Sequence, residues 1–335
     1  MRGWQVRLLA AATVALPILG ACSSNDEPSL VVYNAQHEEL IDIVAEAFTE
    51  ETGIEVELRN GSDLELANQL VEEGDASPAD VFLTENSPAM TLVDSKDMFA
   101  QLDKATLDLV SSQYRPTDGQ WTGFAARSTV LVYNTDQLDE SELPTSIMDL
   151  AEPEWRDRIA FSPTGADFQA IVSAVLALEG EPATRQWLAG LKANGAVYDG
   201  NNVVLESVNA GEIPAGVIYH YYWYRDQEES GENSDSSQLH FFDNQDPGAF
   251  VSVSGAGVLK SSDDASDAQD FVAYLVSEQG QQVIADSYAL EYTLNPDVNL
   301  GRDVRGLSEL EPPKVNVSDL NGPRVVSLMQ EAGFL

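Results

Sequence analysis

Four side chains that could bind a metal ion each follow a segment that is predicted to be a buried strand. They are His37, Glu85, Tyr221 and Tyr222. Consecutive residues of a regular strand point to opposite faces of the sheet. The adjacent side chains of Tyr221 and Tyr222 can therefore converge on one centre only where the backbone has left the strand, for instance in the first turn of a helix.

One imidazole, one carboxylate and two phenols form a ligand set that favours ferric iron. A free tyrosine titrates at about pH 10, so phenolate binding at neutral pH needs a strong, hard Lewis acid, and Fe³⁺ meets that need better than Zn²⁺ or Ca²⁺. The carboxylate and both phenolates would offset the charge of Fe³⁺ in a partly closed cleft, where uncompensated charge is costly. Two positions of an octahedron remain for an anion or water.

Each of these residues also has a purely structural explanation when it is taken singly. His37 could be a surface histidine that opens a helix, and Glu85 an acid at a helix N-terminus. The two tyrosines could be aromatic residues of the core or of a clamp. The metal hypothesis therefore depends on the four residues occurring together.

Strands and helices alternate in the first part of the chain. The predicted strands are residues 30–34, 54–58 and 79–83, and the predicted helices run from His37 to about Glu51 and from Leu64 to Glu73. Gly53 and Gly74 are fitting C-terminal stops for these helices. This order predicts right-handed βαβ units and a parallel sheet.

A second series of elements begins at residue 128. Strands are predicted at residues 128–133, 158–162, 216–219 and 250–259, helices at about 167–178, 187–194, 265–277 and 279–285, and a polar, acidic loop at 226–238. The pattern predicts an α/β fold of two lobes joined by two long strands, which cross near residues 127–133 and 248–258. A ligand would bind in the cleft between the lobes, where the carboxyl ends of strands converge.

The first residues are typical of an export signal. A basic opening with Arg2 and Arg7 precedes the apolar run 8–19, which is too short to span a bilayer comfortably. It ends in Leu19-Gly20-Ala21-Cys22, which resembles a bacterial lipoprotein signal with lipidation of Cys22 after cleavage. An ordinary secretory signal with an incidental cysteine is the alternative. Because Cys22 is the single cysteine, we expect no disulfide within the mature chain and no thiolate metal site.

The resulting organisation has six parts. We expect a signal peptide at residues 1–21, a tether at 22–29, lobe 1 at 30–126, lobe 2 at 127–250, a return to lobe 1 at 251–300, and C-terminal helices that pack on lobe 2 at 301–335.

The composition excludes some functions without identifying a ligand. The 335 residues include 17 Lys or Arg and 56 Asp or Glu, a formal charge of −39 that would repel a nucleic-acid backbone. The sequence contains no G-x-S-x-G, H-E-x-x-H or P-loop motif and only three histidines. These features argue against an enzyme, although a secreted hydrolase that uses a carboxylate pair remains a remote alternative.

Several longer motifs resemble one protein family. They are Tyr33-Asn34-Ala35-Gln36-His37, the run Ala79-Asp80-Val81-Phe82 ending in Thr84-Glu85, Tyr221-Tyr222-Trp223-Tyr224, and Gln245-Asp246-Pro247-Gly248-Ala249. The chain is similar, from about residue 30 to 335, to the ferric-iron-binding substrate-binding proteins of bacterial ABC transporters. The resemblance implies the class II periplasmic-binding-protein fold and iron ligation by the four candidate residues. It also implies that metal binding closes the cleft.

The resemblance further implies a synergistic anion, such as phosphate or carbonate, beside the iron. The matching anion-binding positions are Thr164, Gly165, Ala166, Asn201 and Asn86. A loop at a helix N-terminus suits an anion on physical grounds as well. This sequence departs from the family at Asn86, where a Gln is usual, and at Tyr219, where some members have an Asn. Arg127, just before the first crossing, is expected to form a hinge salt bridge.

We therefore expect a monomeric, lipid-anchored, extracytoplasmic protein that captures Fe³⁺ and delivers it to an ABC permease. It would act in the periplasm or on the outer face of the cytoplasmic membrane, without binding nucleic acid. A binding protein for an organic cation such as a polyamine or thiamine is the alternative, with the aromatic residues forming a cage. Such a cage needs neither a histidine nor a phenolate.

Overall fold

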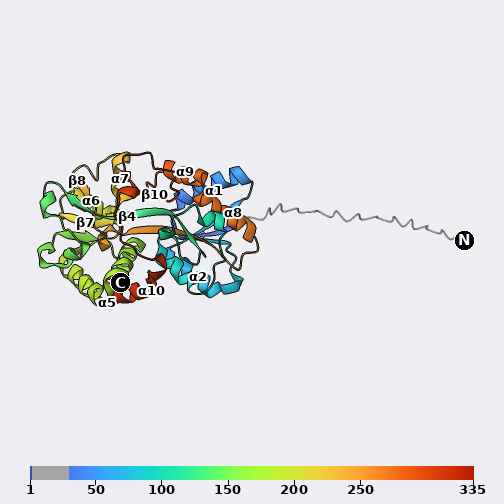
Figure 1. Ribbon diagram of the computed structural model, residues 1–335, viewed down its shortest axis with the longest axis horizontal. Helices are drawn as coiled ribbons and strands as arrows, with labels where there is room; N and C mark the ends of the chain where they lie inside the picture. Colours follow the sequence, from blue (N-terminus) through green and yellow to red (C-terminus); the bar gives the residue numbers. More distant parts are fainter. Residues whose placement is uncertain (2–29) are drawn as a thin grey trace.

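The computed structural model describes residues 30–335. The lipidation of Cys22 and the tether at 22–29 lie outside the described residues, as does the predicted signal peptide after its first residue. Two groups of elements lie side by side along the long axis of the molecule, with the strand β4 (Thr122–Asn134) running between them (Figure 1). Within residues 30–335, no helix is long and apolar enough to cross a membrane.

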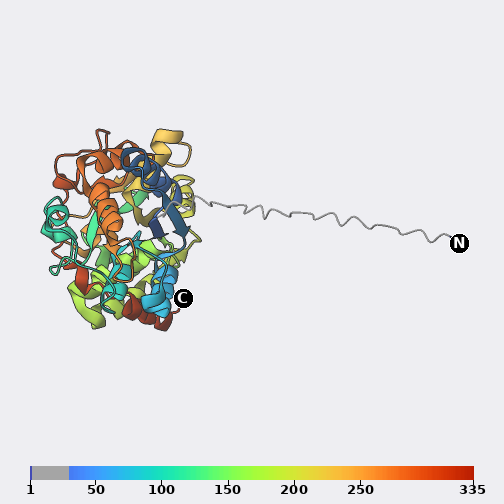
Figure 2. The same cartoon turned by 90° about the vertical axis from the view of Figure 1, so that its right-hand side faces the viewer.

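The first lobe begins with the predicted alternation of strands and helices. Its elements are β1 (Leu30–Asn34), α1 (Glu38–Thr52), β2 (Val56–Asn60), α2 (Asp63–Glu73), β3 (Val81–Leu83), α3 (Ser87–Asp94) and α4 (Lys104–Leu107). The helix α1 buries one apolar face and ends at Gly53, whose φ of 78° is the left-handed conformation that glycine adopts readily. The parallel strands lie in the order β2-β1-β3. Because the order reverses at β1, right-handed crossovers place α1 and α2 on opposite faces of the sheet (Figure 2).

The second lobe repeats this topology. Its elements are β5 (Ile159–Phe161), α5 (Ala166–Asn194), β6 (Gly195–Val197), α6 (Asn201–Asn209), β7 (Ala215–Tyr219) and α7 (His220–Glu229). The central strand β5 pairs in parallel with both β6 and β7. The two helices predicted at 167–178 and 187–194 form one element, which is broken at Gly180, with a φ of 77°, just before Pro182.

Two long strands connect the lobes. In β4, Ser128 pairs with β9 (Val251–Val258), whereas the next residue, Thr129, pairs with Tyr219 of β7. The strand therefore changes lobes within the predicted crossing at 127–133. The first half of β4 pairs with β9 and β10 (Tyr292–Thr293), and the second half pairs with β7 and β8 (Ser237–His240). Because both halves have strand neighbours, all residues of β4 are buried.

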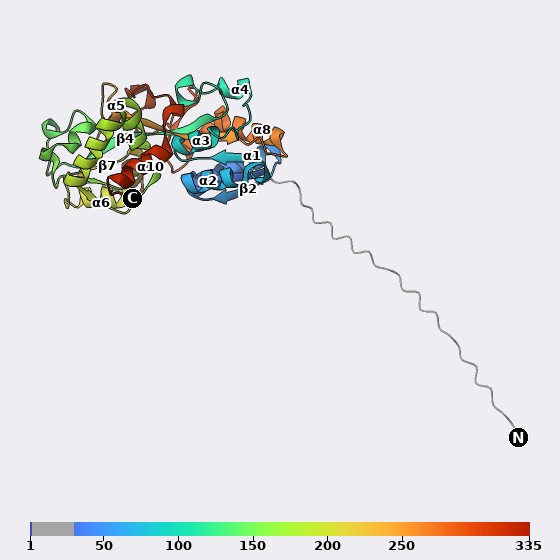
Figure 3. The ribbon, with the colours of Figure 1, turned by 90° about the horizontal axis from the view of Figure 1, so that it is seen from below.

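The last part of the chain returns to both lobes. The helices α8 (Ala265–Val276) and α9 (Glu278–Asp286) belong to the first lobe, where α9 lies against α1. The helix α10 (Gly322–Glu331) lies along α5 of the second lobe (Figure 3). The segment 301–335 was predicted to contain C-terminal helices, and its helical parts are α10 and two short 3₁₀ turns at Leu307–Glu309 and Val317–Asp319. The exact lobe boundaries stay predictions.

The prediction of an acidic loop at 226–238 was wrong at its start, because residues 226–229 belong to a helix. The helix α7 continues to Glu229 because no glycine or proline interrupts residues 220–229. It ends before Gly231, which has a φ of 72°. Ser237 and Gln238 also belong to β8 rather than to the loop.

Candidate metal centre

The candidate ligands lie at the points where the strand order reverses in each lobe. Such a reversal opens a crevice at the carboxyl ends of the strands, which is where α/β sheets bind ligands. His37 follows β1 and Glu85 follows β3, the two strands on either side of the first reversal. Tyr221 and Tyr222 follow β7, beside the reversal at β5 in the second lobe. The repeated topology therefore directs both ligand pairs towards the space between the lobes.

His37 brings together candidate ligands of both lobes. Its Nε2 atom lies 3.6 Å from Oε1 of Glu85 and 3.5 Å from Oη of Tyr221. Neighbouring ligand atoms around an octahedral ion with bonds of about 2.1 Å lie roughly 3 Å apart. Both distances from Nε2 of His37 are therefore within about 0.6 Å of the spacing that a shared metal ion would require.

The tyrosine pair sits in the first turn of α7, as the sequence required. The ring centroids of Tyr221 and Tyr222 are 4.2 Å apart with an interplanar angle of 29°, so the two rings stack. The side chain of Tyr221 is fully buried, and its ring packs edge-on against that of His37. The hydroxyl of Tyr222 donates a hydrogen bond to Asp167, at 3.1 Å.

Asp167 is a site residue that the sequence analysis missed. It is the second residue of α5, where the helix dipole favours an anionic group. Its Oδ2 atom accepts hydrogen bonds from Tyr222 and from Nδ2 of Asn201, at 2.8 Å, and its Oδ1 atom accepts one from Nδ2 of Asn86, at 3.3 Å. The sequence feature that could have identified Asp167 is its position at the start of the helix after β5, which matches the position of His37 before the helix after β1.

The structure does not bring all of the predicted anion-binding residues to one place. Asn86 and Asn201 meet at the carboxylate of Asp167, so each amide already donates one of its two N–H groups to the protein. Gly165 is the N-cap of α5 and Ala166 its first residue, as predicted for a helix N-terminus. Thr164 has an exposed side chain in the preceding turn. Tyr219, which stands where some relatives have an Asn, donates to the backbone carbonyl of Asp167 at 3.3 Å.

Burial favours the uncharged form of most of these groups. Burial raises the pKa of Tyr221 and Tyr222 well above that of a free phenol, and nearby carboxylates add to the effect. Burial and the neighbouring Asp167 raise the pKa of Glu85 in the same direction. A cation that binds here must therefore displace protons, and its affinity must fall as the pH is lowered.

Arg127 forms the predicted salt bridge at the hinge. Its Nη2 atom lies 2.7 Å from Oε2 of Glu291, and both side chains are fully buried. Arg127 also donates to the backbone carbonyl of Glu85, which ties a candidate ligand to β4. Glu291, like Asp167, was not foreseen from the sequence.

The phenols are essential to any metal site at this place. Among residues 30–335, no three His, Cys, Asp or Glu side chains gather in a way that could hold a metal ion. His37 and Glu85 supply only two donors of that kind. The tyrosines of the second lobe therefore decide whether a metal can be held.

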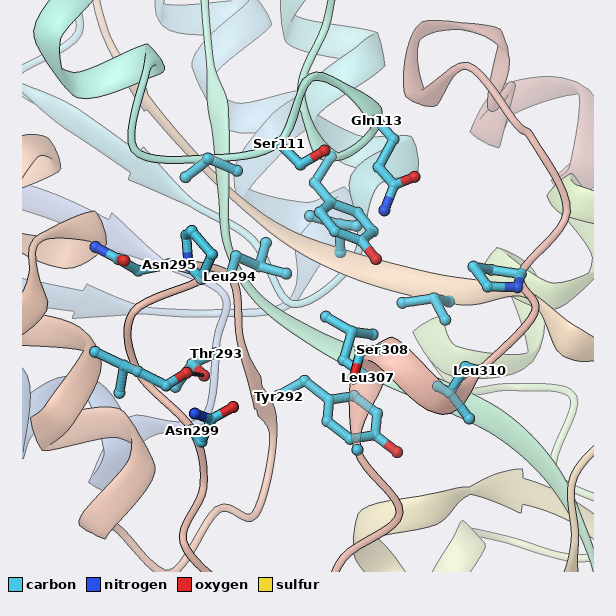
Figure 4. A pocket seen from close by; sticks show the side chains of 18 of the residues that line it. Ser111, Gln113, Tyr292, Thr293, Leu294, Asn295, Asn299, Leu307, Ser308 and Leu310 are labelled. Carbon is cyan, nitrogen blue, oxygen red and sulfur yellow. Dashed lines mark hydrogen bonds between the residues drawn. The ribbon is translucent and has the colours of Figure 1, made fainter.

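A large cavity lies on the opposite side of the connecting strands. It has a volume of about 1230 Å³ and is lined by Val251 and Val253 of β9 and by Tyr292 (Figure 4). The alternate residues Ser252 and Ser254 instead contact Asn86 and the backbone of Glu85. Successive residues of a strand face opposite sides, so β9 separates this cavity from the candidate metal centre.

Known proteins resemble the chain over nearly its whole length. It is 52% identical over 330 residues to the Fe(3+)-binding periplasmic protein of Serratia marcescens, covering 98% of this chain and 97% of that protein. It is 38% identical over 330 residues to the major ferric iron-binding protein of Neisseria meningitidis serogroup B, with the same coverage. The sequence profile of the family described as "Bacterial extracellular solute-binding protein" matches residues 76–303.

Solved structures confirm the predicted fold class. Iron-bound HitA from Pseudomonas aeruginosa matches with a TM-score of 0.85 at 42% identity, covering 91% of this chain and 99% of that chain. The two-lobed class II periplasmic-binding-protein fold is therefore confirmed. Members of this family are transport binders, which confirms that the chain is not an enzyme. The chain is a bacterial extracellular solute-binding protein of the family to which these ferric-iron-binding proteins belong.

Proposed function

We propose that this chain captures Fe³⁺ between its two lobes and delivers it to the permease of an ABC transporter for iron uptake. The observation that carries this proposal is the approach of Nε2 of His37 to Glu85 and to Tyr221, at 3.6 and 3.5 Å. Donors of the two lobes meet there at nearly the spacing of one coordination sphere. The iron-binding relatives in Serratia and Neisseria support the choice of metal.

His37, Glu85, Tyr221 and Tyr222 are the proposed iron ligands. The carboxylate and the two phenolates offset the charge of Fe³⁺, which would otherwise be costly in a largely buried site. The imidazole of His37 supplies a neutral donor. Since the two lobes contribute two ligands each, the bound ion holds them together.

Asp167 is the proposed fifth ligand, in place of an external anion. Among residues 30–335 it does not yet form a metal-binding group with His37 and Glu85, so we propose that it joins them when iron binds. Its carboxylate is already held by Tyr222, Asn201 and Asn86 at the place where a synergistic anion was expected. Phosphate or carbonate would compete there with a carboxylate of the same sign. The protein therefore supplies its own anionic group, and iron binding does not depend on added anion.

The cellular setting follows from the family and from the first residues. A solute-binding protein of this family implies a permease partner in the cytoplasmic membrane. The lipoprotein-like sequence before Cys22 supports an anchor on the extracytoplasmic side of a membrane, in the periplasm or on the outer face of the cytoplasmic membrane. We further propose that the chain acts as a monomer.

The decisive experiment is an iron titration followed by visible absorbance. The soluble chain beginning at residue 23 is titrated with ferric citrate, beside Tyr221→Phe, Tyr222→Phe and the control Tyr133→Phe, a buried tyrosine of β4. We expect a phenolate-to-iron charge-transfer band that saturates at one iron per chain. Either site variant weakens or abolishes the band, whereas the control keeps it.

A wild-type protein without the band, even with phosphate or carbonate present, would refute the proposed function. An organic cation would then become the leading ligand, and calorimetry with polyamines and thiamine would test it. Turnover in a panel of hydrolase substrates would point instead to the remote alternative, a secreted hydrolase.

A further inference from the structure

Glu291 lies beside the candidate metal centre, directly before β10. Its side chain is fully buried. Its Oε2 atom accepts hydrogen bonds from Nη2 of Arg127, at 2.7 Å, and from Nε2 of Gln36, at 3.2 Å. The other carboxylate oxygen, Oε1, lies 3.3 Å from Nδ1 of His37.

Within residues 30–335, neither of these two facing atoms has a hydrogen-bond partner. Both Oε1 of Glu291 and Nδ1 of His37 are buried, and neither makes a hydrogen bond of good geometry within the described residues. Leaving buried polar atoms unpaired is costly. Both are satisfied together only when Nδ1 carries the proton and donates it towards Glu291, and a small tightening of the 3.3 Å contact is enough.

We propose that Glu291 is a positioning residue that holds His37 as the Nδ1–H tautomer and turns its bare Nε2 lone pair towards the iron. This inference rests on the proposed function, because it concerns the availability of one proposed ligand. A carboxylate behind a metal-binding histidine fixes the tautomer and the ring orientation. Arg127 and Gln36 hold Glu291 in turn, so the direction of Nε2 is set before the metal arrives.

The backbone before Glu291 is held in a conformation that points to the same role. Leu290 is buried, yet its φ is 56°, which is rare for a bulky residue. Strained backbone of this kind persists where the surrounding structure fixes it, and it clusters at functional sites. Here it directs Glu291 towards His37, while Tyr292 lines the cavity on the other side of the connecting strands (Figure 4).

The other two histidines of the chain have the opposite tautomer. Nδ1 of His220 accepts a hydrogen bond from the backbone N–H of Ser128, at 3.2 Å, so its proton is on Nε2. Nε2 of His240 lies 2.9 Å from the carbonyl oxygen of Pro144 and must donate to it. His37 is therefore distinct among the three histidines, which makes its tautomer measurable.

The test is a nitrogen-15 NMR spectrum of the iron-free chain labelled only at histidine, recorded at mildly alkaline pH. We expect one Nδ1–H and two Nε2–H imidazoles, with the Nδ1–H signals missing in His37→Gln. In Glu291→Gln, we expect the amide oxygen to face the donor Arg127 and the NH₂ group to face His37. This variant should convert His37 to the Nε2–H form and weaken iron binding by roughly 10- to 100-fold in citrate competition.

Glu278→Gln, an exposed carboxylate at the start of α9, is the matched control and should change neither measurement. The wild-type spectrum needs no variant, so the proposal stays testable if Glu291→Gln fails to fold. An Nε2–H form of His37 in the wild type would overturn the role of Glu291, as would an unchanged tautomer and affinity in Glu291→Gln. A wild type that binds no iron would instead overturn the proposed function, whatever its tautomer.

Discussion

Asp167 differs from the other proposed ligands because the protein already holds its carboxylate with three donors. Tyr222, Asn201 and Asn86 come from both lobes, so this carboxylate is oriented before any metal binds. Asp63 serves the neighbouring loop in a related way, since its carboxylate accepts the backbone N–H groups of Glu85 and Asn86 at 2.8 and 2.9 Å. Acidic groups thus orient both the loop that carries Glu85 and the carboxylate that we propose as the anionic ligand.

At this scale we predict the outcome of Asp167→Asn. The amide keeps the size of the side chain but removes the charge, so the iron loses one anionic ligand. In buffer without phosphate or carbonate, the dissociation constant for iron should rise by at least the roughly 10- to 100-fold that is typical of removing a supporting group around a metal. Citrate competition measures it.

Added phosphate should restore part of the affinity of Asp167→Asn and leave the wild type unchanged. Asp157→Asn, at an exposed aspartate of the same lobe, provides the control. If the wild type also needed phosphate to bind iron, Asp167 would not be the ligand that replaces the anion.

At the scale of elements, a group of exposed charges lies at the contact between α5 and α10. Glu181, just after the break at Gly180, accepts hydrogen bonds from Nε and Nη2 of Arg324 at 3.0 and 2.6 Å, and from Nε of Arg185 at 3.0 Å. These donors lower the pKa of Glu181 to about 2. The charges therefore add to the apolar packing of Val325, Leu328 and Met329, which buries one face of α10 against the second lobe.

This arrangement predicts how Glu181→Gln depends on pH. The glutamate has a lower pKa in the folded chain than its ordinary value of 4.5, so its stabilising effect is complete above that value and disappears as the pH falls towards 2. Near neutral pH, the variant should have a lower melting temperature than the wild type, and in acid the two melting temperatures should be equal. Salt should reduce the difference at neutral pH. Thermal unfolding monitored by circular dichroism, with Glu179→Gln as control, measures it. An equal difference at every pH would contradict the ion-pair explanation.

Local sequence patterns predicted most elements but not every side chain of the site. Alternating strands and amphipathic helices are local features, so β1 and α1 were predicted together with the candidate ligand His37 between them. The convergence of the two tyrosines required a helical turn, and they lie in the first turn of α7. Asp167 was missed because the Thr164-Gly165-Ala166 loop was taken to bind an external anion. Glu291 was missed because it lies between the left-handed Leu290 and a strand of only two residues, where no periodic pattern exists. Its position depends on contacts with residues that are distant in the sequence.

At the scale of the whole molecule, the proposed ligands make iron a link between two lobes. A ligand that binds only the folded state stabilises it according to its concentration and affinity, by about 2.7 kcal/mol at 100 times the dissociation constant. We therefore predict that iron raises the melting temperature of both lobes in one transition. Differential scanning calorimetry with and without ferric citrate measures the shift.

The tyrosine variants separate this linking role from ordinary binding. Iron should raise the melting temperature of Tyr222→Phe by less than that of the wild type, whereas the rise for Tyr133→Phe should equal that of the wild type. Two separate transitions in the iron-loaded wild type, with only one of them shifted, would mean that the ion is held by a single lobe.

The path of β4 through both lobes has a consequence for how a partner could recognise the loaded protein. Because one buried strand pairs with β9 and β10 in the first lobe and with β7 and β8 in the second, the two outer surfaces are joined by a single continuous element. An ion that fixes the lobes also fixes the spacing of those surfaces. A membrane receptor that contacts both lobes can thus distinguish the iron-loaded protein from the iron-free protein by the spacing of those surfaces, without touching the metal.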